Sequence, residues 1–220
     1  MPNSVDVKSK FLGAMISSAL GDAIGELASS YVREADLCAK IAQTDPLVYT
    51  DDTAMAVGLA ESLTRVGRLD LQHLGDTFRA NFVREPWRGY ATGPPTIFSM
   101  VERYGTSYAG AASSLFGGQG SFGNGAAMRI TPVALVFHDR ADLYQKARAS
   151  ASVTHAHPIG LDGAAVLVRA VAQAVKLDPQ EPFPLEGFCR GLADFAQTKE
   201  IRSRMELDAA SLFDSLCRSG

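Results

Sequence analysis

The chain has 220 residues, with 21 Lys plus Arg against 24 Asp plus Glu, which gives a formal net charge of −3. Hydrophobic residues make up 46% and charged residues 20%, as is typical of a folded globular domain and not of a disordered chain, a collagen or a coiled-coil rod. The near-neutral balance argues against a protein that binds nucleic acid by bulk charge, but it leaves room for a local anion site. We expect a single domain over residues 1–220.

The cysteines and the apolar segments indicate the compartment. Cys38, Cys189 and Cys217 lie far apart and form no Cys-x-x-Cys pair, so we expect no disulfide framework and a reducing, cytoplasmic location. No uninterrupted apolar run reaches roughly 18 residues, so we expect no membrane partner. The apolar stretch 11–20 follows two lysines, as in a signal peptide, but the preceding Asp6 favours the first helix of the domain.

Apolar residues recur at helical spacing along most of the chain, which predicts an all-α fold. The sets that predict helices are Phe11, Met15, Leu20 and Ile24; Met55, Leu59, Leu63 and Val66; Leu71, Leu74, Phe78 and Phe82, with Asp70 as N-cap; Leu143, Ala147 and Ala151; Leu161, Ala164, Leu167, Val168, Val171 and Val175, after Pro158 in the first turn; and, more weakly, Leu192 and Phe195, then Met205, Leu212 and Leu216. The run 47–49 is strand-like, and the prolines at 179–184 predict a turn between two helices.

The segment Thr50–Asp51–Asp52–Thr53 places two adjacent carboxylates between two hydroxyls at the start of a predicted helix. One interpretation is a helix N-terminus that Thr50 or Asp51 caps and whose dipole the acids complement. The other is a site for a hard cation, because carboxylate and hydroxyl oxygens suit Mg²⁺. The two interpretations are compatible.

Five glycines are concentrated between Gly117 and Gly125. The Gly-x-Gly-x-x-Gly match within this loop lacks the preceding strand of a dinucleotide-binding fold, and no Gly-Lys-Ser/Thr follows as in a P-loop. Because we expect a helix directly after the loop, its backbone N–H groups are candidates for holding a phosphate or diphosphate. The alternative is a flexible connection, but Ser121 and Asn124 add donors and Phe122 adds a stacking face, which favours a ligand.

Two histidines follow in the segment Thr154–His155–Ala156–His157–Pro158. The remaining His and Cys residues make no recognisable ligand set, so we do not expect zinc. His157 is a candidate cap for the helix that begins at Pro158. His155 either makes a structural hydrogen bond or, as a neutral ring, faces a polar ligand.

The segment Gly21–Asp22–Ala23–Ile24–Gly25 puts two glycines inside the first predicted helix, each at a cost of about 1 kcal/mol relative to Ala. Such glycines serve close packing or leave room for a ligand. Asp22 lies on an otherwise apolar face, so we expect its carboxylate to be hydrogen-bonded.

In this order, the four segments resemble the ADP-ribosylglycohydrolase family, which includes dinitrogenase-reductase-activating glycohydrolases and ADP-ribosylhydrolases. The resemblance extends from about residue 11 to about residue 175. It implies an orthogonal bundle of α-helices and an enzyme that hydrolyses ADP-ribosyl glycosidic bonds. It also implies two Mg²⁺ ions as cofactors and ADP-ribose or an ADP-ribosylated protein as the partner.

The resemblance also implies roles for individual residues. Thr50, Asp51 and Asp52 would be metal ligands, and the two aspartates would be catalytic. The residues that would bind the ligand are Gly120, Ser121, Phe122, Gly123 and Asn124 at the diphosphate and proximal ribose, Phe116 on the adenine side, and His155.

The sequence departs from the family pattern at two places. Ser29 stands where the family carries a glutamate, and Glu26 and Glu34 are nearby acids out of register. The family's C-terminal motif Gly-Asp-Thr-Asp-Thr has no counterpart, so we expect a fold cut short at its C-terminal end and slow or no hydrolysis. The alternatives to an active enzyme are a module that binds ADP-ribose or a nucleotide without catalysis, and a truncated gene product.

Overall fold

The computed structural model describes residues 6–207, and every regular element in this range is a helix. The elements are α1 (Val7–Ala28), α2 (Glu34–Gln43), α3 (Asp51–Val66), α4 (Leu71–Arg84), α5 (Gly93–Tyr104), α6 (Tyr108–Gly118), the 3₁₀ turn η1 (Asn124–Ala126), α7 (Thr131–Phe137), α8 (Leu143–Ala151), α9 (Pro158–Lys176) and α10 (Leu185–Phe195). Residues 199–207 are also helical. The predicted all-α fold class is confirmed.

The helices with the strongest apolar period were predictable from the sequence and correspond to α1, α3, α4, α8 and α9. Two of their starts are confirmed in detail. Asp70 accepts a hydrogen bond from the backbone N–H of His73 at 3.0 Å, and His157 Nδ1 accepts one from the N–H of Ile159 at 3.3 Å. The sequence analysis did not predict α2, α5, α6 or α7.

Two local predictions have a different outcome. Residues 47–49 have no regular secondary structure, and the described part of the chain contains no strand, so the strand-like run does not form one. The weak helical pattern of the tail continues to Leu212 and Leu216, which lie outside the described residues. The prolines at 179–184 do lie between two helices, α9 and α10, as predicted.

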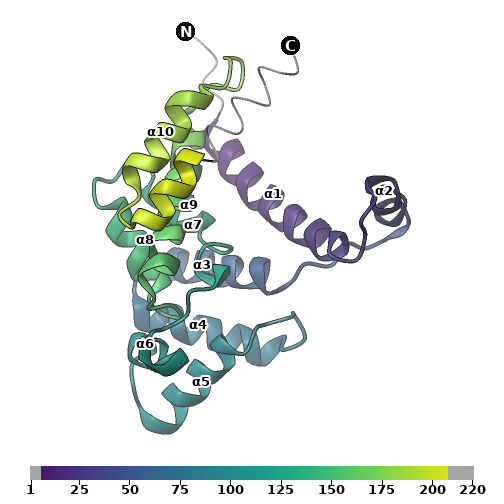
Figure 1. The fold of residues 1–220 in the computed structure, drawn as a ribbon. Helices are drawn as coiled ribbons and strands as arrows, with labels where there is room; N and C mark the ends of the chain where they lie inside the picture. The colour runs from purple at the N-terminus through teal and green to yellow at the C-terminus, as the bar shows by residue number, and fades with distance from the viewer. Residues whose placement is uncertain (1–5, 208–220) are drawn as a thin grey trace.

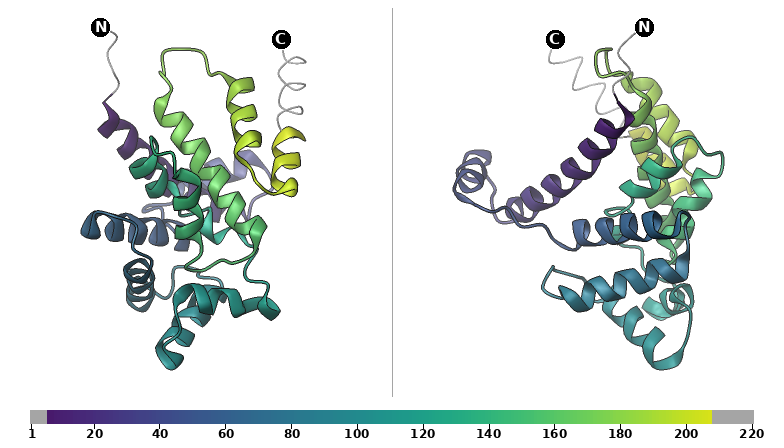
Figure 2. Two further views of the ribbon diagram at one scale, coloured as in Figure 1. Left: turned by 90° about the vertical axis from the view of Figure 1, so that its left-hand side faces the viewer. Right: turned by 180° about the vertical axis from the view of Figure 1, so that it is seen from behind.

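The main hydrophobic core is built around α3. Figures 1 and 2 show α4, α5 and α6 on one side of this helix and α7 to α10 on the other. Met55 and Leu59 of α3, Phe78 of α4, Ile97 of α5 and Val168 of α9 are all at most 2% exposed. Eight residues of α3 are buried, so packing positions the helix whose first two residues are Asp51 and Asp52.

Helix α1 extends away from this core and carries α2 at its far end (Figure 1). Along one stripe of α1, Leu12, Ile16 and Leu20 are 54%, 64% and 47% exposed. By length and composition, α1 and α9 are the two described helices that could cross a membrane. Core helices and N-terminal signal sequences share these properties, and α9 is a core helix, so the finding alone does not indicate a membrane span.

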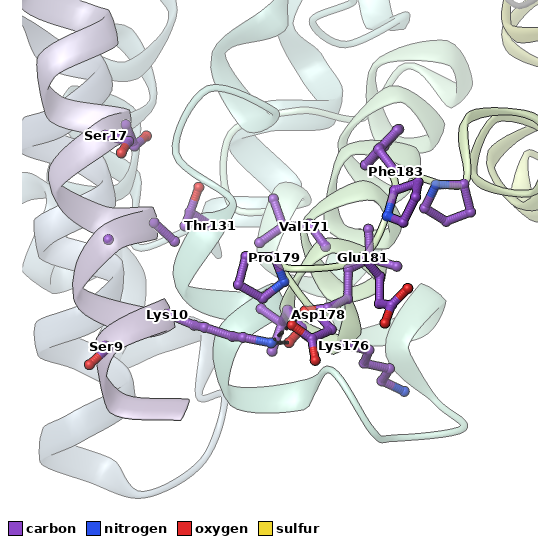
Figure 3. A pocket seen from close by; sticks show the side chains of 18 residues that line it. Ser9, Lys10, Ser17, Thr131, Val171, Lys176, Asp178, Pro179, Glu181 and Phe183 are labelled. Carbon is purple, nitrogen blue, oxygen red and sulfur yellow. Dashed lines mark hydrogen bonds between the residues drawn. The ribbon is translucent and has the colours of Figure 1, made fainter. Parts of the chain in front are cut away.

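An apolar groove of about 1030 Å³ opens between α1 and the connection from α9 to α10 (Figure 3). At one edge of the groove, Lys10 Nζ donates to the carbonyl oxygens of Val175 and Leu177, at 2.6 and 2.7 Å. These are carbonyls at the C-terminal end of α9, where a cation is favourable. Lys10 therefore ties α1 to α9.

Candidate functional site

The start of α3 is held by a side chain from another helix. Asp22, in α1, accepts hydrogen bonds from the backbone N–H groups of Thr50 and Thr53 at 2.9 and 3.1 Å, and from both of their hydroxyls at 2.6 Å. The predicted hydrogen bonding of Asp22 is confirmed. Thr50 occupies the N-cap position of α3, as one interpretation of the sequence predicted, but its side chain makes no cap hydrogen bond within the helix.

The reason is geometric. Thr50 directs its hydroxyl to Asp22, and the Asp22 carboxylate satisfies the N–H groups that a local cap would otherwise take. Burial opposes ionisation of Asp22, but the four hydrogen bonds outweigh burial and lower its pKa below the usual range. Asp22 is therefore a fixed negative charge at the start of α3.

Asp51 and Asp52, the first two residues of α3, carry carboxyl groups whose ionised forms are destabilised. The pKa of Asp51 is raised to about 6, first by burial and then by the charge of Asp52. Burial, followed by the charge of Asp22, also raises the pKa of Asp52. Three negative charges thus gather at one helix N-terminus, and a bound cation would relieve their repulsion.

An acidic cavity of about 310 Å³ opens at this point between α1 and α3. Its lining residues are Ser18, Gly21, Asp22, Gly25, Glu26, Thr50, Asp52 and Met128. Of the two acids near the family's glutamate position, Glu26 lines this cavity, whereas Glu34 is the first residue of α2. Ser29 is the C-cap of α1, where its hydroxyl donates to the carbonyl oxygen of Glu26 at 2.7 Å.

The glycine-rich loop lies tightly against the turn before α9. A Cβ atom added at Gly120, where φ is +73°, would lie 2.5 Å from the Cβ of Ala156 and 2.9 Å from the backbone N of His157. One added at Gly125 would lie 3.1 Å from Cε1 of His155. One added at Gly160 would lie 3.1 Å from the carbonyl oxygen of Ser121. Two of the five loop glycines, Gly120 and Gly125, therefore allow close packing against the turn before α9, which argues against the interpretation of this segment as a flexible connection.

The expected helix directly after the loop is not present. Asn124–Ala126 forms a three-residue 3₁₀ turn, and the next α-helix, α7, begins at Thr131. The loop therefore does not offer an α-helix N-terminus to an anion. Its backbone is shaped by its own turns, including a hydrogen bond from the N–H of Gly123 to Ser121 Oγ at 3.3 Å.

The two aromatic residues predicted to face the ligand are both exposed. Phe122, at the tip of the loop, packs edge-on against the ring of His157, with the ring centroids 5.4 Å apart. Phe116 lies near the end of α6 in the left-handed region, with φ 54°, which is rare for a non-glycine residue. Each ring is 64% exposed, so each has a free face. Phe116 is not among the residues that line the acidic cavity.

A buried arginine connects the loop to the turn that carries His155. Arg129 is fully buried and donates to the carbonyl oxygen of Gly125 at 3.0 Å and to the hydroxyl of Thr154 at 2.6 Å. Its guanidinium also lies 4.7 Å from the ring centroid of Phe78. Thr154 Oγ1 in turn lies 2.8 Å from His155 Nδ1. Burial, and then the charge of Arg129, lowers the pKa of His155 to about 3, so the ring is neutral, as one interpretation of the sequence required.

The same arginine connects the loop to α3. Arg129 Nη1 lies 3.7 Å from Sδ of Met55. Burial lowers the pKa of Arg129, and the charge of Asp51 opposes this by favouring the protonated guanidinium. The adjacent residue, Met128, lines the acidic cavity together with Asp52. The structure therefore brings the carboxylates of α3, the glycine loop and His155 to one region. The sequence analysis assigned Arg129 no role.

A second residue that the sequence analysis missed is Tyr90. Its hydroxyl is buried without a hydrogen-bond partner in the described structure. Burial, followed by the charge of Asp51, raises its pKa to about 12. The preceding Gly89, with φ +85°, is also close to Asp51, since a Cβ added there would lie 3.9 Å from Asp51 Oδ1. No motif in the sequence pointed to this loop, because its proximity to Asp51 arises only in the fold.

The donor set suits a cation only in part. Within residues 6–207 there is no group of three or more His, Cys, Asp or Glu residues arranged to hold a metal ion. Asp51 and Asp52 supply two carboxylates, and Thr50 adds a hydroxyl oxygen. The hydroxyl of Thr50 donates its proton to Asp22, which leaves the oxygen lone pairs available to a cation.

Comparison with known proteins identifies the family. The family profile described as ADP-ribosylglycohydrolase matches residues 3–216. The chain belongs to the ADP-ribosylglycohydrolase family. It is 30% identical over 220 residues to ADP-ribosylhydrolase ARH3 of Homo sapiens, a match that covers 93% of this chain and 59% of that protein.

A second relative and a solved structure are also similar to the chain. It is 30% identical over 164 residues to the ADP-ribosyl-[dinitrogen reductase] glycohydrolase of Rhodospirillum rubrum, covering 70% of this chain and 53% of that protein. A solved structure titled ADP-ribosylglycohydrolase-related protein complex has the same fold, with a TM-score of 0.65 and 24% identity over 91% of this chain and 67% of that chain. The chain thus spans about 60% of the length of the ARH3 proteins that it matches.

Proposed function

We propose that this protein binds ADP-ribosyl groups and, with Mg²⁺, hydrolyses their glycosidic bond, removing ADP-ribose from a modified protein side chain or a related compound. The observation that carries the proposal is the convergence of three motifs on Arg129. Its side chain contacts α3 at Met55, the glycine loop at Gly125 and the turn of His155 through Thr154. Family membership then indicates the ligand that such a site takes.

Thr50, Asp51 and Asp52 are the residues that would hold the metal ion. Mg²⁺ keeps several waters and needs few protein oxygens, so two carboxylates and one hydroxyl are an adequate start for one ion. The raised pKa values of both carboxyl groups support this assignment, because a cation stabilises their ionised forms. The second ion that the family resemblance implies would need further oxygen ligands. Glu26 could supply one, because it lines the acidic cavity together with Thr50 and Asp52.

The glycine loop would hold the diphosphate and the proximal ribose through Gly120, Ser121, Phe122, Gly123 and Asn124. Its backbone is already held against Ala156 and His155, so little ordering entropy would be lost on binding. The exposed faces of Phe116 and Phe122 are suited to stacking on a base. The neutral ring of His155 would contact the ligand from beneath the loop.

The chemistry follows from this arrangement. Cleavage of a glycosidic bond passes through an oxocarbenium-like transition state, and a bound divalent ion supplies charge stabilisation and orientation of water. Asp51 and Asp52 would orient the attacking water and accept hydrogen bonds from it or from the ribose hydroxyls. Contacts of the loop with the diphosphate lie away from the reacting carbon and would fix its position relative to these carboxylates.

A second candidate is a module that binds ADP-ribose without turnover. The observation that favours it is the absence, within residues 6–207, of three acidic or other ligating side chains in one group. The two candidates share the loop and differ in the use of Asp51 and Asp52.

One experiment separates them. The purified chain is incubated with ADP-ribosylated protein and Mg²⁺, and the released ADP-ribose is measured for wild type and Asp51→Ala. Release that requires Mg²⁺ and is lost in the variant supports the hydrolase. Binding of ADP-ribose without release by either protein supports the binding module, and neither binding nor release would contradict both.

A further inference from the structure

The hydrogen bonds around Thr154 determine which nitrogen of His155 carries the proton. A guanidinium can only donate, so at the 2.6 Å contact with Arg129 Nη2 the hydroxyl oxygen of Thr154 is the acceptor. Thr154 has one hydroxyl proton, and its hydroxyl also lies 2.8 Å from His155 Nδ1. Thr154 is 2% exposed, so a proton directed elsewhere would be buried without an acceptor.

Donation from Thr154 to His155 Nδ1 gives both the Thr154 hydroxyl proton and this ring nitrogen a partner, whereas Arg129 Nε has none among the described residues. His155 is 4% exposed, and its neutral ring carries one N–H. If Nδ1 accepts from Thr154, the proton is on Nε2. A Cβ added at Gly125 would lie 3.4 Å from Nε2, so this nitrogen is on the side of the ring that faces the loop.

We propose that Arg129 and Thr154 are positioning residues that hold His155 as the Nε2–H tautomer, so that the ring directs an N–H donor toward the glycine loop. Because the ligand of the proposed function is anionic, a donor on this side of the ring suits that ligand better than an acceptor does.

Because the charged guanidinium of Arg129 can only donate, it fixes the direction of the hydrogen bonds from Arg129 to Thr154 and from Thr154 to His155. Burial lowers the pKa of Arg129 to about 9, which still leaves it charged at neutral pH. None of the ion pairs among the described residues includes Arg129, and its compensation comes from the Gly125 carbonyl, the Thr154 hydroxyl and the ring of Phe78. Burial of a charged guanidinium costs free energy unless its contacts compensate for the lost hydration. The contacts of Arg129 are with three different segments: the glycine loop, the turn that carries His155, and α4.

The tautomer can be measured directly. The chain has four histidines, so long-range ¹H–¹⁵N spectra of the imidazole rings are simple, and His155→Gln assigns the signal. We expect the Nε2–H pattern for His155 at pH 7 in wild type and in Thr154→Ser. We expect a mixed or Nδ1–H pattern in Thr154→Val, which keeps the shape of the side chain but cannot donate.

Binding provides the second measurement, and it depends on the proposed function, whereas the spectrum does not. Thr154→Val should weaken ADP-ribose binding about tenfold, as expected for the loss of one positioning hydrogen bond. Thr154→Ser should stay within about threefold of wild type. The control is Thr131→Val, at another buried threonine outside this chain of contacts, which should change neither the tautomer nor binding.

An Nδ1–H pattern in wild type would overturn the proposal, as would a Thr154→Val protein with unchanged tautomer and affinity. If Thr154→Val does not fold, the proposal is tested by the wild-type spectrum, which should show the Nε2–H pattern, and by the Thr154→Ser affinity, which should stay within about threefold of wild type. If wild type shows the Nε2–H tautomer but no ADP-ribose binding, the hydrogen-bond chain stands and the proposed function fails.

Discussion

The carboxylate of Asp22 and the hydroxyl of Thr50 lie 2.6 Å apart although 28 residues separate them in the sequence. This contact joins the projecting helix α1 to the start of α3, where the two candidate metal ligands Asp51 and Asp52 follow. Asp162 makes an analogous set of contacts, accepting from the backbone N–H groups of Gln197 and Thr198 and from the Thr198 hydroxyl. One aspartate supports the candidate site and the other supports the fold alone.

The pair offers a matched test of this difference. Asp22→Ala and Asp162→Ala each remove an acceptor of several hydrogen bonds, so each should lower the free energy of unfolding by roughly 3 kcal/mol, measured by urea denaturation. Only Asp22→Ala should also weaken Mg²⁺ binding, because Thr50 then loses its partner. Equal Mg²⁺ affinity in the two variants would mean that Asp22 has no role in the site.

Asp51 predicts a pH dependence of stability in metal-free protein. Its pKa, raised to about 6 by burial and by Asp52, exceeds the unfolded value of 3.8, so the folded state binds more protons between these values. Stability from this group therefore falls as pH rises from about 4 to about 6. Asp51→Asn should raise the free energy of unfolding at pH 7 by about 1 kcal/mol, less than the full shift implies because the carboxyl is partly solvated.

Urea denaturation in a chelator measures this effect at two pH values. The gain from Asp51→Asn should disappear near pH 4, where the wild-type carboxyl is protonated in the folded state. The same gain at both pH values would show that electrostatic repulsion is not its cause.

Mg²⁺ binding should depend on the carboxylates of α3. Asp51→Ala and Asp52→Ala should each reduce Mg²⁺ affinity at least tenfold in calorimetry, because each removes one of two carboxylate ligands. The wild-type affinity itself should be weak, since residues 6–207 bring no third His, Cys, Asp or Glu side chain into the group. If both variants bind as wild type does, Asp51 and Asp52 serve only to complement the helix dipole.

ADP-ribose should stabilise the protein against heat in the presence of Mg²⁺. Asn124→Ala should reduce the shift in Tm, because Asn124 is exposed on the loop and supplies a side-chain donor. Differential scanning fluorimetry measures both. No shift for wild type with Mg²⁺ present would argue against the assignment of the loop.

Gly120 should be intolerant of a side chain. In Gly120→Ala the new Cβ would meet Ala156 at 2.5 Å, and the backbone at φ +73° is strained for any L residue, so the loop should move and ADP-ribose binding should be lost. The control is Gly13→Ala in α1, where nothing lies within 4 Å and a helical glycine is replaced. That variant should bind as wild type and gain up to about 1 kcal/mol of stability. Loss of binding in both would show that the effect is not local to the loop.

The sequence was sufficient wherever the signal is local. The apolar period of 55–66 and 161–175, the cap at Asp70 and the proline at Pro158 all act within a few residues, and the corresponding helices formed as predicted. The motif residues themselves could also be found, because Thr50–Asp51–Asp52 and the glycine loop differ from ordinary helix and loop composition. The order of the motifs then pointed to the family, which the profile match confirmed.

The tertiary structure decided how these parts act together. The helix expected after Gly125 did not form, because Arg129 binds the Gly125 carbonyl and Gly125 packs against His155, which holds this segment as a short 3₁₀ turn. The partners of Asp22, and the arginine that binds Thr154, likewise lie 25 or more residues away and leave no periodic trace. Contacts at such separations depend on how the helices pack. The sequence by itself therefore determined the helices and the motifs. Packing determined the hydrogen bonds, the burial and the raised pKa values that define the site.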